Sequence, residues 1–340
     1  MLAHHLFAQE NVTNWSVISA FPFITPDSLS AFALQGKVCV TIFTFLSAFG
    51  MSRKYQSLES NHALTAKSLT SVSISRYIKM MSGFYFVWLL ALLARGLTTP
   101  LTQIFGEGSL TSVSFWGQMV IDALGLQYLF GTPTLNATWW YMTLAQVLLF
   151  AFPLLYLLYK KIGSLILPLA FLLPLVTNQI DFFAFYAFSA ACGIVCAENN
   201  FFERVKEKTW PKYIVFIAAL ILLFSAAKAI AAINAFLTIF VYSALTVVIS
   251  LLCYCLLSGT RTGKILAFVG THSANMFLTH TLLFAYLFPR FFYGFHYSEL
   301  IWLMLMLSSL ALSVVLEFVK RKSGYSKLFK RVELYFSRSV

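Results

Sequence analysis

The segment 235–257, AFLTIFVYSALTVVISLLCYCLL, decides the class of fold, because it runs for 23 residues without a charged side chain. An α-helix of that length is long enough to cross the roughly 30 Å of hydrocarbon in a bilayer. Eight further apolar segments occupy residues 38–52, 80–97, 139–159, 163–177, 181–197, 212–233, 265–288 and 299–319. We therefore predict an all-α, polytopic transmembrane helical bundle with nine to ten transmembrane helices.

Composition argues against a water-soluble fold. Of the 340 residues, 59% are hydrophobic and only 11% are charged. The formal net charge of +12 could suit nucleic acid. However, the cations flank apolar segments, where anionic lipid headgroups attract juxtamembrane basic residues. We expect a lipid bilayer as the partner of these cations and no nucleic acid.

The basic residues also predict the orientation in the membrane. If the connection 52–79 lies in the cytoplasm, all but four of the 24 Lys and Arg residues fall on the cytoplasmic side. This bias follows the positive-inside rule. We predict a multi-pass protein of the cell membrane (plasma or inner), with a transmembrane domain over 1–319 and a basic cytoplasmic tail over 320–340. The tail is expected to be amphipathic or disordered.

Two outer loops, about 8–36 and 98–138, are long and rich in aromatic residues. Within the second, the stretch 114–130 mixes apolar and polar side chains and includes Asp122. This pattern predicts an amphipathic or half-inserted helix. Both loops are expected to be partly folded.

The chain begins MLAHHLF and turns polar immediately afterwards. This stretch lacks the basic region and the long apolar region of a secretory signal peptide. One interpretation is a short external N-terminus on which His4 and His5 are surface residues. The other is the outer end of a first helix that begins upstream, in which case about 10–25 further residues are needed to complete a span.

Further motifs follow in order. They are GKVCVTIFTFLSAFG at 36–50, RYIK at 76–79, TWWY at 138–141 and NMFLTH at 275–280. In order, spacing and sidedness these resemble the membrane acyltransferase-3 family of bacterial polysaccharide O-acyltransferases, and the resemblance covers nearly the whole chain. It implies ten helices with both termini in the cytoplasm, an acyl-CoA donor such as acetyl-CoA, and O-acetylation of a glycan in polysaccharide or exopolysaccharide biosynthesis.

The resemblance also implies a basic residue eleven positions before the histidine of the first helix. Counting back from His5 places that position before Met1, so we expect it on the upstream extension. The family's Arg-x-x-x-Arg motif at the third helix is only partly matched, by Arg76 and Lys79.

Acetyl transfer to a sugar hydroxyl needs a base, and an imidazole with a pKa near 6.5 is suited to that task at neutral pH. His5 is the predicted catalytic base and His4 its rival, since neighbours on a helix point about 100° apart. Arg76, Lys79 and Arg53 are the expected contacts for the phosphates of the donor. Alternatively, these cations serve only to set the topology in the membrane, because the cytoplasmic ends of transmembrane helices commonly carry basic residues.

The predicted acceptor-binding residues are Trp139, Trp140, Tyr141, Asp122 and His280. Aromatic rings can stack on sugars, although an interfacial belt is the more common reason for aromatic residues at a helix end. A polar group at mid-span, such as His280, is a functional hypothesis by default, although a satisfied buried histidine is the other interpretation.

No metal site is predicted, because the i, i+4 pair Cys192 and Cys196 has no further ligands nearby and a thiol in a span packs as a small apolar residue. The leading functional hypothesis is an O-acyltransferase. A transporter or flippase for a lipid-linked sugar is the alternative, but no internal repeat is visible. A third hypothesis, a structural or sensor membrane protein, does not explain why histidines and cations should occur in an ordered set.

Overall fold

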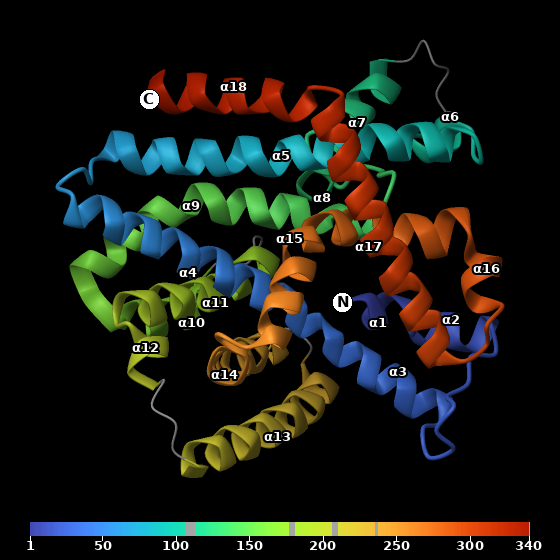
Figure 1. Cartoon of the computed structure of the whole chain (residues 1–340), viewed down its shortest axis with the longest axis horizontal. Helices are drawn as coiled ribbons and strands as arrows, with labels where there is room; N and C mark the ends of the chain where they lie inside the picture. Colours follow the sequence, from blue (N-terminus) through green and yellow to red (C-terminus); the bar gives the residue numbers. More distant parts are fainter. Residues whose placement is uncertain (107–112, 177–180, 206–209, 235–236, 340) are drawn as a thin grey trace. The chain divides into compact units, whose positions relative to one another are not determined.

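The computed structural model describes residues 1–106, 113–176, 181–205, 210–234 and 237–339 (Figure 1). The parts of the expected segments and loops at 107–112, 177–180, 206–209 and 235–236 lie outside this range. The regular elements are α1 Leu2–Leu6, α2 Gln9–Asn14, α3 Pro26–Leu34, η1 Gln35–Lys37, α4 Val38–Ser60, α5 Ala66–Gly96, α6 Leu101–Ile104, α7 Val113–Ala123, α8 Gln127–Phe130, η2 Ala137–Trp139, α9 Trp140–Ile162, η3 Gly163–Leu165, α10 Ile166–Val176, α11 Asp181–Glu198, α12 Phe201–Val205, α13 Trp210–Ile233, α14 Thr238–Leu257, α15 Arg261–Thr281, η4 Leu282–Leu287, α16 Pro289–Tyr293, α17 Ser298–Lys322 and α18 Tyr325–Ser339. Within the described residues the chain is all-α, as predicted.

In the part of the chain that the structure describes, six helical segments are long and apolar enough to cross a membrane. They are Pro26–Ser60, Ala66–Gly96, Ala137–Pro174, Lys212–Ile230, Thr238–Leu257 and Ser298–Lys322. The expected segment 181–197 corresponds to a shorter apolar helix, Phe183–Glu198, and 265–288 falls in α15 and the π-helical η4. Apolar helices of membrane length are therefore confirmed, while the finer number of nine to ten stays a prediction.

The chain divides into two compact units. Unit 1 contains 1–36, 74–146 and 268–339, and unit 2 contains 37–73 and 147–267. Consequently, the predicted catalytic histidines, acceptor residues and two of the three donor cations belong to unit 1.

Unit 2 is built around the pair α4 and α11. Gly193 on α11 lies so close to α4 that a Cβ there would be 2.5 Å from the Phe45 carbonyl oxygen. Small residues permit such approach between helices in lipid, and buried hydroxyls strengthen it. Ser189 donates to the Thr41 carbonyl at 2.8 Å, and Thr41 Oγ1 lies 2.8 Å from Thr246 Oγ1 on α14.

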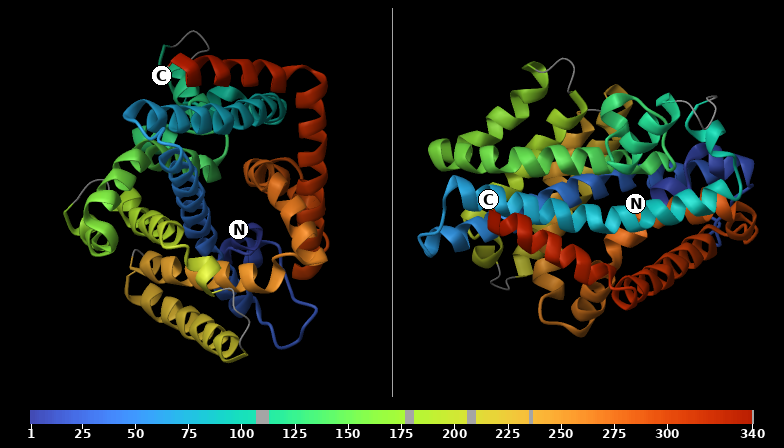
Figure 2. Two further views of the ribbon diagram at one scale, coloured as in Figure 1. Left: turned by 60° about the vertical axis from the view of Figure 1, so that its left-hand side comes forward. Right: turned by 90° about the horizontal axis from the view of Figure 1, so that it is seen from above.

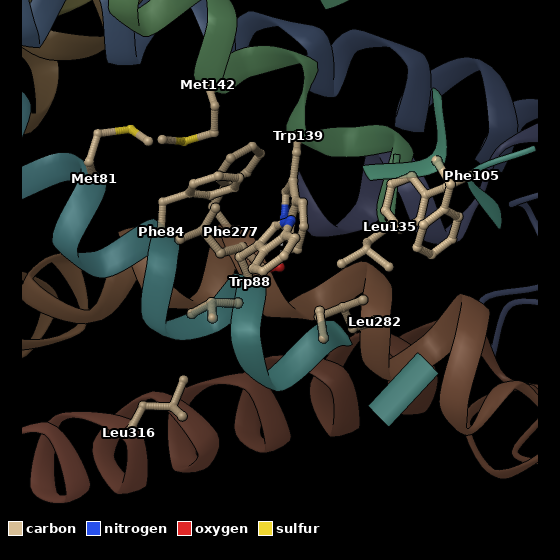
Figure 3. Packing of buried hydrophobic residues seen from close by; sticks show 14 residues of the cluster. Met81, Phe84, Trp88, Phe105, Leu135, Trp139, Met142, Phe277, Leu282 and Leu316 are labelled. Carbon is tan, nitrogen blue, oxygen red and sulfur yellow. Dashed lines mark hydrogen bonds between the residues drawn. The ribbon is translucent and has the colours of Figure 1, made fainter. Parts of the chain in front are cut away.

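Unit 1 has its main apolar cluster along the C-terminal half of α5. Figure 3 shows Phe84 and Trp88 of α5 packed with Trp139, Phe277 and Leu282. This cluster joins α5, the start of α9 and the end of α15. It therefore fixes the backbone on which several predicted site residues lie.

The tail forms a helix, α18, that follows α17 after a sharp change of direction (Figure 2). Gly324 permits the turn, because its φ of +78° is costly for residues with a Cβ. Tyr325 donates to the Ser82 carbonyl at 2.7 Å, and Ser75 donates to Glu333. The tail is thus an ordered helix beside α5, and its cytoplasmic location remains a prediction.

Candidate functional site

The short helix α1 lies directly against the residues that precede α4. His4 Nδ1 lies 3.2 Å from the Ala33 carbonyl oxygen, so this nitrogen must carry the hydrogen. Gly36 faces the same residue, and a Cβ built on Gly36 would be 2.9 Å from the His4 Cβ. Glycine at position 36 is therefore needed for close approach, not for an unusual φ.

The backbone of α1 is also fixed at its C-terminal end. Asn11 Nδ2 donates to the His5 carbonyl at 3.0 Å, and the Tyr293 hydroxyl donates to the Leu6 carbonyl at 2.9 Å. Burial raises the pKa of Tyr293, which keeps this hydroxyl protonated. Trp15 stacks on Tyr293 with ring centroids 5.1 Å apart. These contacts hold the half-buried His5 on a five-residue helix that could not persist alone.

Part of the expected outer loop 8–36 is tied to the residues that precede α17. Ile18 and Tyr297 form an isolated parallel bridge, in which Ser298 N donates to the Ile18 carbonyl at 2.8 Å. Glu299 accepts from Ser19 Oγ at 2.5 Å. Residues 8–36 are therefore partly folded, and their location on the outer side of the membrane stays a prediction.

His280 is fully buried at the end of α15, where the helix changes to the π-helical η4. Its Nδ1 lies 2.7 Å from the Phe277 carbonyl oxygen and 3.2 Å from that of Met276. Carbonyl oxygens only accept, so Nδ1 carries the ring hydrogen and Nε2 is the other site of protonation. A single π-helical turn often marks a functional site, because the change of register frees backbone groups for side chains.

The three histidines form one cluster. The ring centroids of His5 and His280 are 5.2 Å apart with an interplanar angle of 42°, and those of His4 and His5 are 4.9 Å apart. The sequence separates His5 from His280 by almost the entire chain, so no local pattern could predict this pairing. We predicted His280 as an acceptor-binding residue; the structure buries its side chain and places its ring next to that of His5, and its role stays a prediction.

Asp122 is buried at the end of α7, in contrast to an acid at a solvated loop edge. Its Oδ2 accepts from Trp88 Nε1 at 2.9 Å and from the Leu135 backbone N–H at 3.3 Å. Burial raises the pKa of Asp122, while these bonds and the Thr134 hydroxyl oppose the rise. The carboxyl group therefore fastens the segment around Leu135 to α5. The expected amphipathic helix over 114–130 is present as α7 and α8.

The aromatic triplet has three different environments. Trp139 is fully buried, and its Nε1 donates to the Leu278 carbonyl at 3.0 Å. Tyr141 packs edge-on against Phe277 with centroids 5.4 Å apart. Trp140 is half-buried and lies 6.2 Å from the ring of the exposed Tyr128. Of the triplet, Trp140 is the residue best placed to reach a sugar, whereas Trp139 holds α15.

The predicted donor cations also differ. Arg76 and Lys79 are exposed on α5, and among the described residues neither forms an ion pair. Arg53, in unit 2, pairs with Glu203 and donates to Asn200 at 2.6 Å. Arg76 and Lys79 can donate to phosphate oxygens without an ion pair to break, whereas Arg53 already donates to Glu203 and Asn200.

Sequence reasoning missed several polar residues that the fold brings together. The guanidinium carbon of Arg95 lies 4.0 Å from the centroid of the Tyr286 ring, and Arg95 donates to the Leu135 carbonyl at 2.6 Å. Asn136 and Thr138 bond to one another beside α15. The TWWY motif at 138–141 pointed to the aromatic rings, but the hydroxyl of Thr138 carried no recognisable signal.

A second, partly buried group of polar side chains joins α15 and α17. Glu317 Oε1 accepts from Lys320 Nζ and from Asn275 Nδ2, each at 2.9 Å. Asn275 also donates to Ser313 Oγ at 3.2 Å, and His272 Nδ1 lies 2.8 Å from that oxygen. Paired charges of this kind satisfy one another inside a helical bundle. They account for Asn275 in the 275–280 motif as a structural residue.

Within the described residues no three His, Cys, Asp or Glu side chains are grouped to hold a metal ion. No protein-family model, curated protein or solved structure matches this chain. The geometry of the site and the motifs in the sequence are therefore the features that bear on function.

Proposed function

We propose that this chain is a membrane O-acyltransferase that moves an acetyl group from acetyl-CoA to a hydroxyl of a cell-surface or lipid-linked polysaccharide. The observation that supports this most is the cluster of His5, His4 and the buried His280 on apolar helices of unit 1. Ionisable side chains are costly in such surroundings and are usually functional there.

The proposed base is His5. Hydrogen bonds to the backbone carbonyls of His5 and Leu6 hold the helix that carries it, so the direction of the imidazole is set before substrate binds. His4 is the rival, because its Nδ1–H bond to the Ala33 carbonyl leaves Nε2 as a basic nitrogen, whereas His5 is preferred because its ring lies next to that of the buried His280. The base takes the hydroxyl proton as the sugar oxygen attacks the thioester carbonyl, and the thiolate leaves with the electrons of the C–S bond.

The proposed donor site is the exposed pair Arg76 and Lys79. Both lie on α5, which continues without interruption to the cluster around Trp88. Cations in the N-terminal half of this helix can bind the CoA phosphates, and Trp140 with Tyr128 offers aromatic faces to an acceptor. The bundle would then take its donor from the cytoplasm and its acceptor from the other side.

The test is acetyl transfer by the purified protein from labelled acetyl-CoA to candidate lipid-linked glycans. His5→Ala should lower the rate by about 10²–10⁴, the usual loss for a general base. His4→Ala is the matched control and should retain most of the activity. Wild-type protein that transports glycan in vesicles but never consumes acetyl-CoA would instead establish the transporter alternative.

A further inference from the structure

A chain of hydrogen bonds runs from His280 to Asn136 through two threonine hydroxyls. His280 Nε2 lies 3.2 Å from Thr281 Oγ1, which lies 3.1 Å from Thr138 Oγ1. Thr138 Oγ1 donates to Asn136 Oδ1 at 2.9 Å. The Asn136 oxygen is identified by the Thr138 backbone N–H, which can only donate and lies 3.1 Å away. All four side chains are buried.

The number of hydrogens on this chain depends on the charge of His280. When the ring is neutral, Nε2 has no hydrogen because Nδ1 holds it. Thr138 uses its hydroxyl hydrogen on Asn136, so Thr281 has one hydrogen for two contacts, Nε2 and Thr138. A proton on Nε2 removes the shortage, because each group then donates to the next. The chain is complete only when His280 carries a second proton.

We propose that His280 is a positioning residue that holds a proton for His5, and that Thr281, Thr138 and Asn136 align it for this role. The inference rests on the proposed function. The two rings are 5.2 Å apart, and two imidazolium charges at that separation repel. The pair therefore carries one proton at a time and titrates as a unit.

The proton balance of the reaction follows from this arrangement. The acceptor O–H proton moves to His5 while the C–O bond forms and the C–S bond breaks. It then resides on His280 Nε2, which returns His5 to its neutral form. The CoA thiolate finally takes the proton to become a thiol, so both rings end neutral. The other groups that face this pair are His4 and the amino group of Met1.

The experiment compares Thr281→Val, which keeps the shape and removes the hydroxyl, with Thr281→Ser, which keeps the hydroxyl. Thr138→Val and Thr138→Ser form a second matched pair. Each Val variant should lower kcat about tenfold with an unchanged KM for acetyl-CoA, because the missing bond acts after donor binding. Each Ser variant should stay within about twofold of wild type.

A second readout needs no acyl transfer. Diethyl pyrocarbonate modifies neutral imidazole, and mass spectrometry of the His5 peptide gives the midpoint of this reaction between about pH 5 and 8. In the Val variants and in His280→Gln the shared proton should stay on His5, so the midpoint should move to higher pH. Should a Val variant fail to fold, His280→Gln still decides, because glutamine can bond to Thr281 but cannot hold a proton.

Unchanged kcat in both Val variants, or an unchanged His5 midpoint in His280→Gln, would overturn the inference. Wild-type protein that never consumes acetyl-CoA would instead remove the proposed function. The two failures are distinguishable, because the modification midpoint of His5 reports on the proton shared with His280 whether or not the protein is an acyltransferase.

Discussion

Replacing Gly36 with alanine tests whether the position of α1 matters for chemistry. The new Cβ would lie 2.9 Å from the His4 Cβ, and ordinary contact begins at 3.4 Å, so α1 must retreat by at least about 0.5 Å. Because α1 also carries His5, the retreat changes the position of the proposed base relative to His280.

For Gly36→Ala, two opposing effects set the change in the free energy of unfolding, and the displacement of α1 sets the change in kcat. Alanine in place of a helical glycine contributes about 0.5–1 kcal/mol of stability, whereas overpacking costs about 1–3 kcal/mol. We therefore expect a net loss of about 1–2 kcal/mol in the free energy of unfolding. A displacement of 1 Å can cost about 100-fold in rate, so a shift half as large should lower kcat by about tenfold.

The assay is acetyl transfer together with thermal unfolding in the same detergent. Gly50→Ala is the matched control, because no atom lies within 4 Å of a Cβ built there. That variant should gain slightly in stability and keep its rate. If Gly36→Ala has the stability and rate of wild type, then the contact with His4 does not position the histidines, and the reasoning about α1 is refuted.

Two further predictions concern Asp122 and the donor cations. Asp122→Ala leaves the Trp88 and Leu135 N–H groups without their acceptor and should cost about 2–5 kcal/mol of unfolding free energy, while Asp122→Asn should cost much less. Burial raises the pKa of Asp122, so the folded state binds more protons than the unfolded state. Wild type should therefore lose stability relative to Asp122→Asn as the pH rises from about 4 towards neutrality. Urea titrations of both proteins at several pH values measure this, and a stability difference that changes in the opposite direction would contradict it. Arg76→Ala should raise the KM for acetyl-CoA with little change in kcat. Arg53→Ala should lower stability and leave the KM unaffected, because Arg53 pairs with Glu203. If steady-state kinetics show the reverse pattern, Arg53 and not Arg76 contacts the donor.

The sequence predicted those features that depend on local composition. The apolar run 235–257 gives α14, and the TWWY motif falls where α9 begins at Trp140. The mixed stretch 114–130 gives the amphipathic α7. In each case a helix needs only its own residues to satisfy its backbone in a membrane, so a single segment suffices for the prediction.

The environments of single side chains could not be predicted in the same way. Trp139 at a helix end has the same local pattern whether it faces lipid or, as observed, the α15 backbone. Asp122 looks like a loop acid until Trp88 and Leu135 are brought to it by the fold. Arg53 and Arg76 belong to the same basic connection, 52–79, in the sequence, but Arg53 finds an acid in Glu203, which lies 150 residues further along the chain.

The length of α5 constrains how donor and base can cooperate within unit 1. Arg76 and Trp88 are twelve residues apart on one continuous helix, which corresponds to about 18 Å along its axis. Trp88 belongs to the same apolar cluster as Leu278, two residues before His280, so about this length of α5 separates the proposed phosphate contacts from the cluster beside His280. In the proposed reaction, a thioester held by its phosphates at Arg76 would have to extend along α5 to reach the histidines. A rigid helix keeps this separation constant, and small displacements of α1 should then affect the rate far more than the binding of the donor.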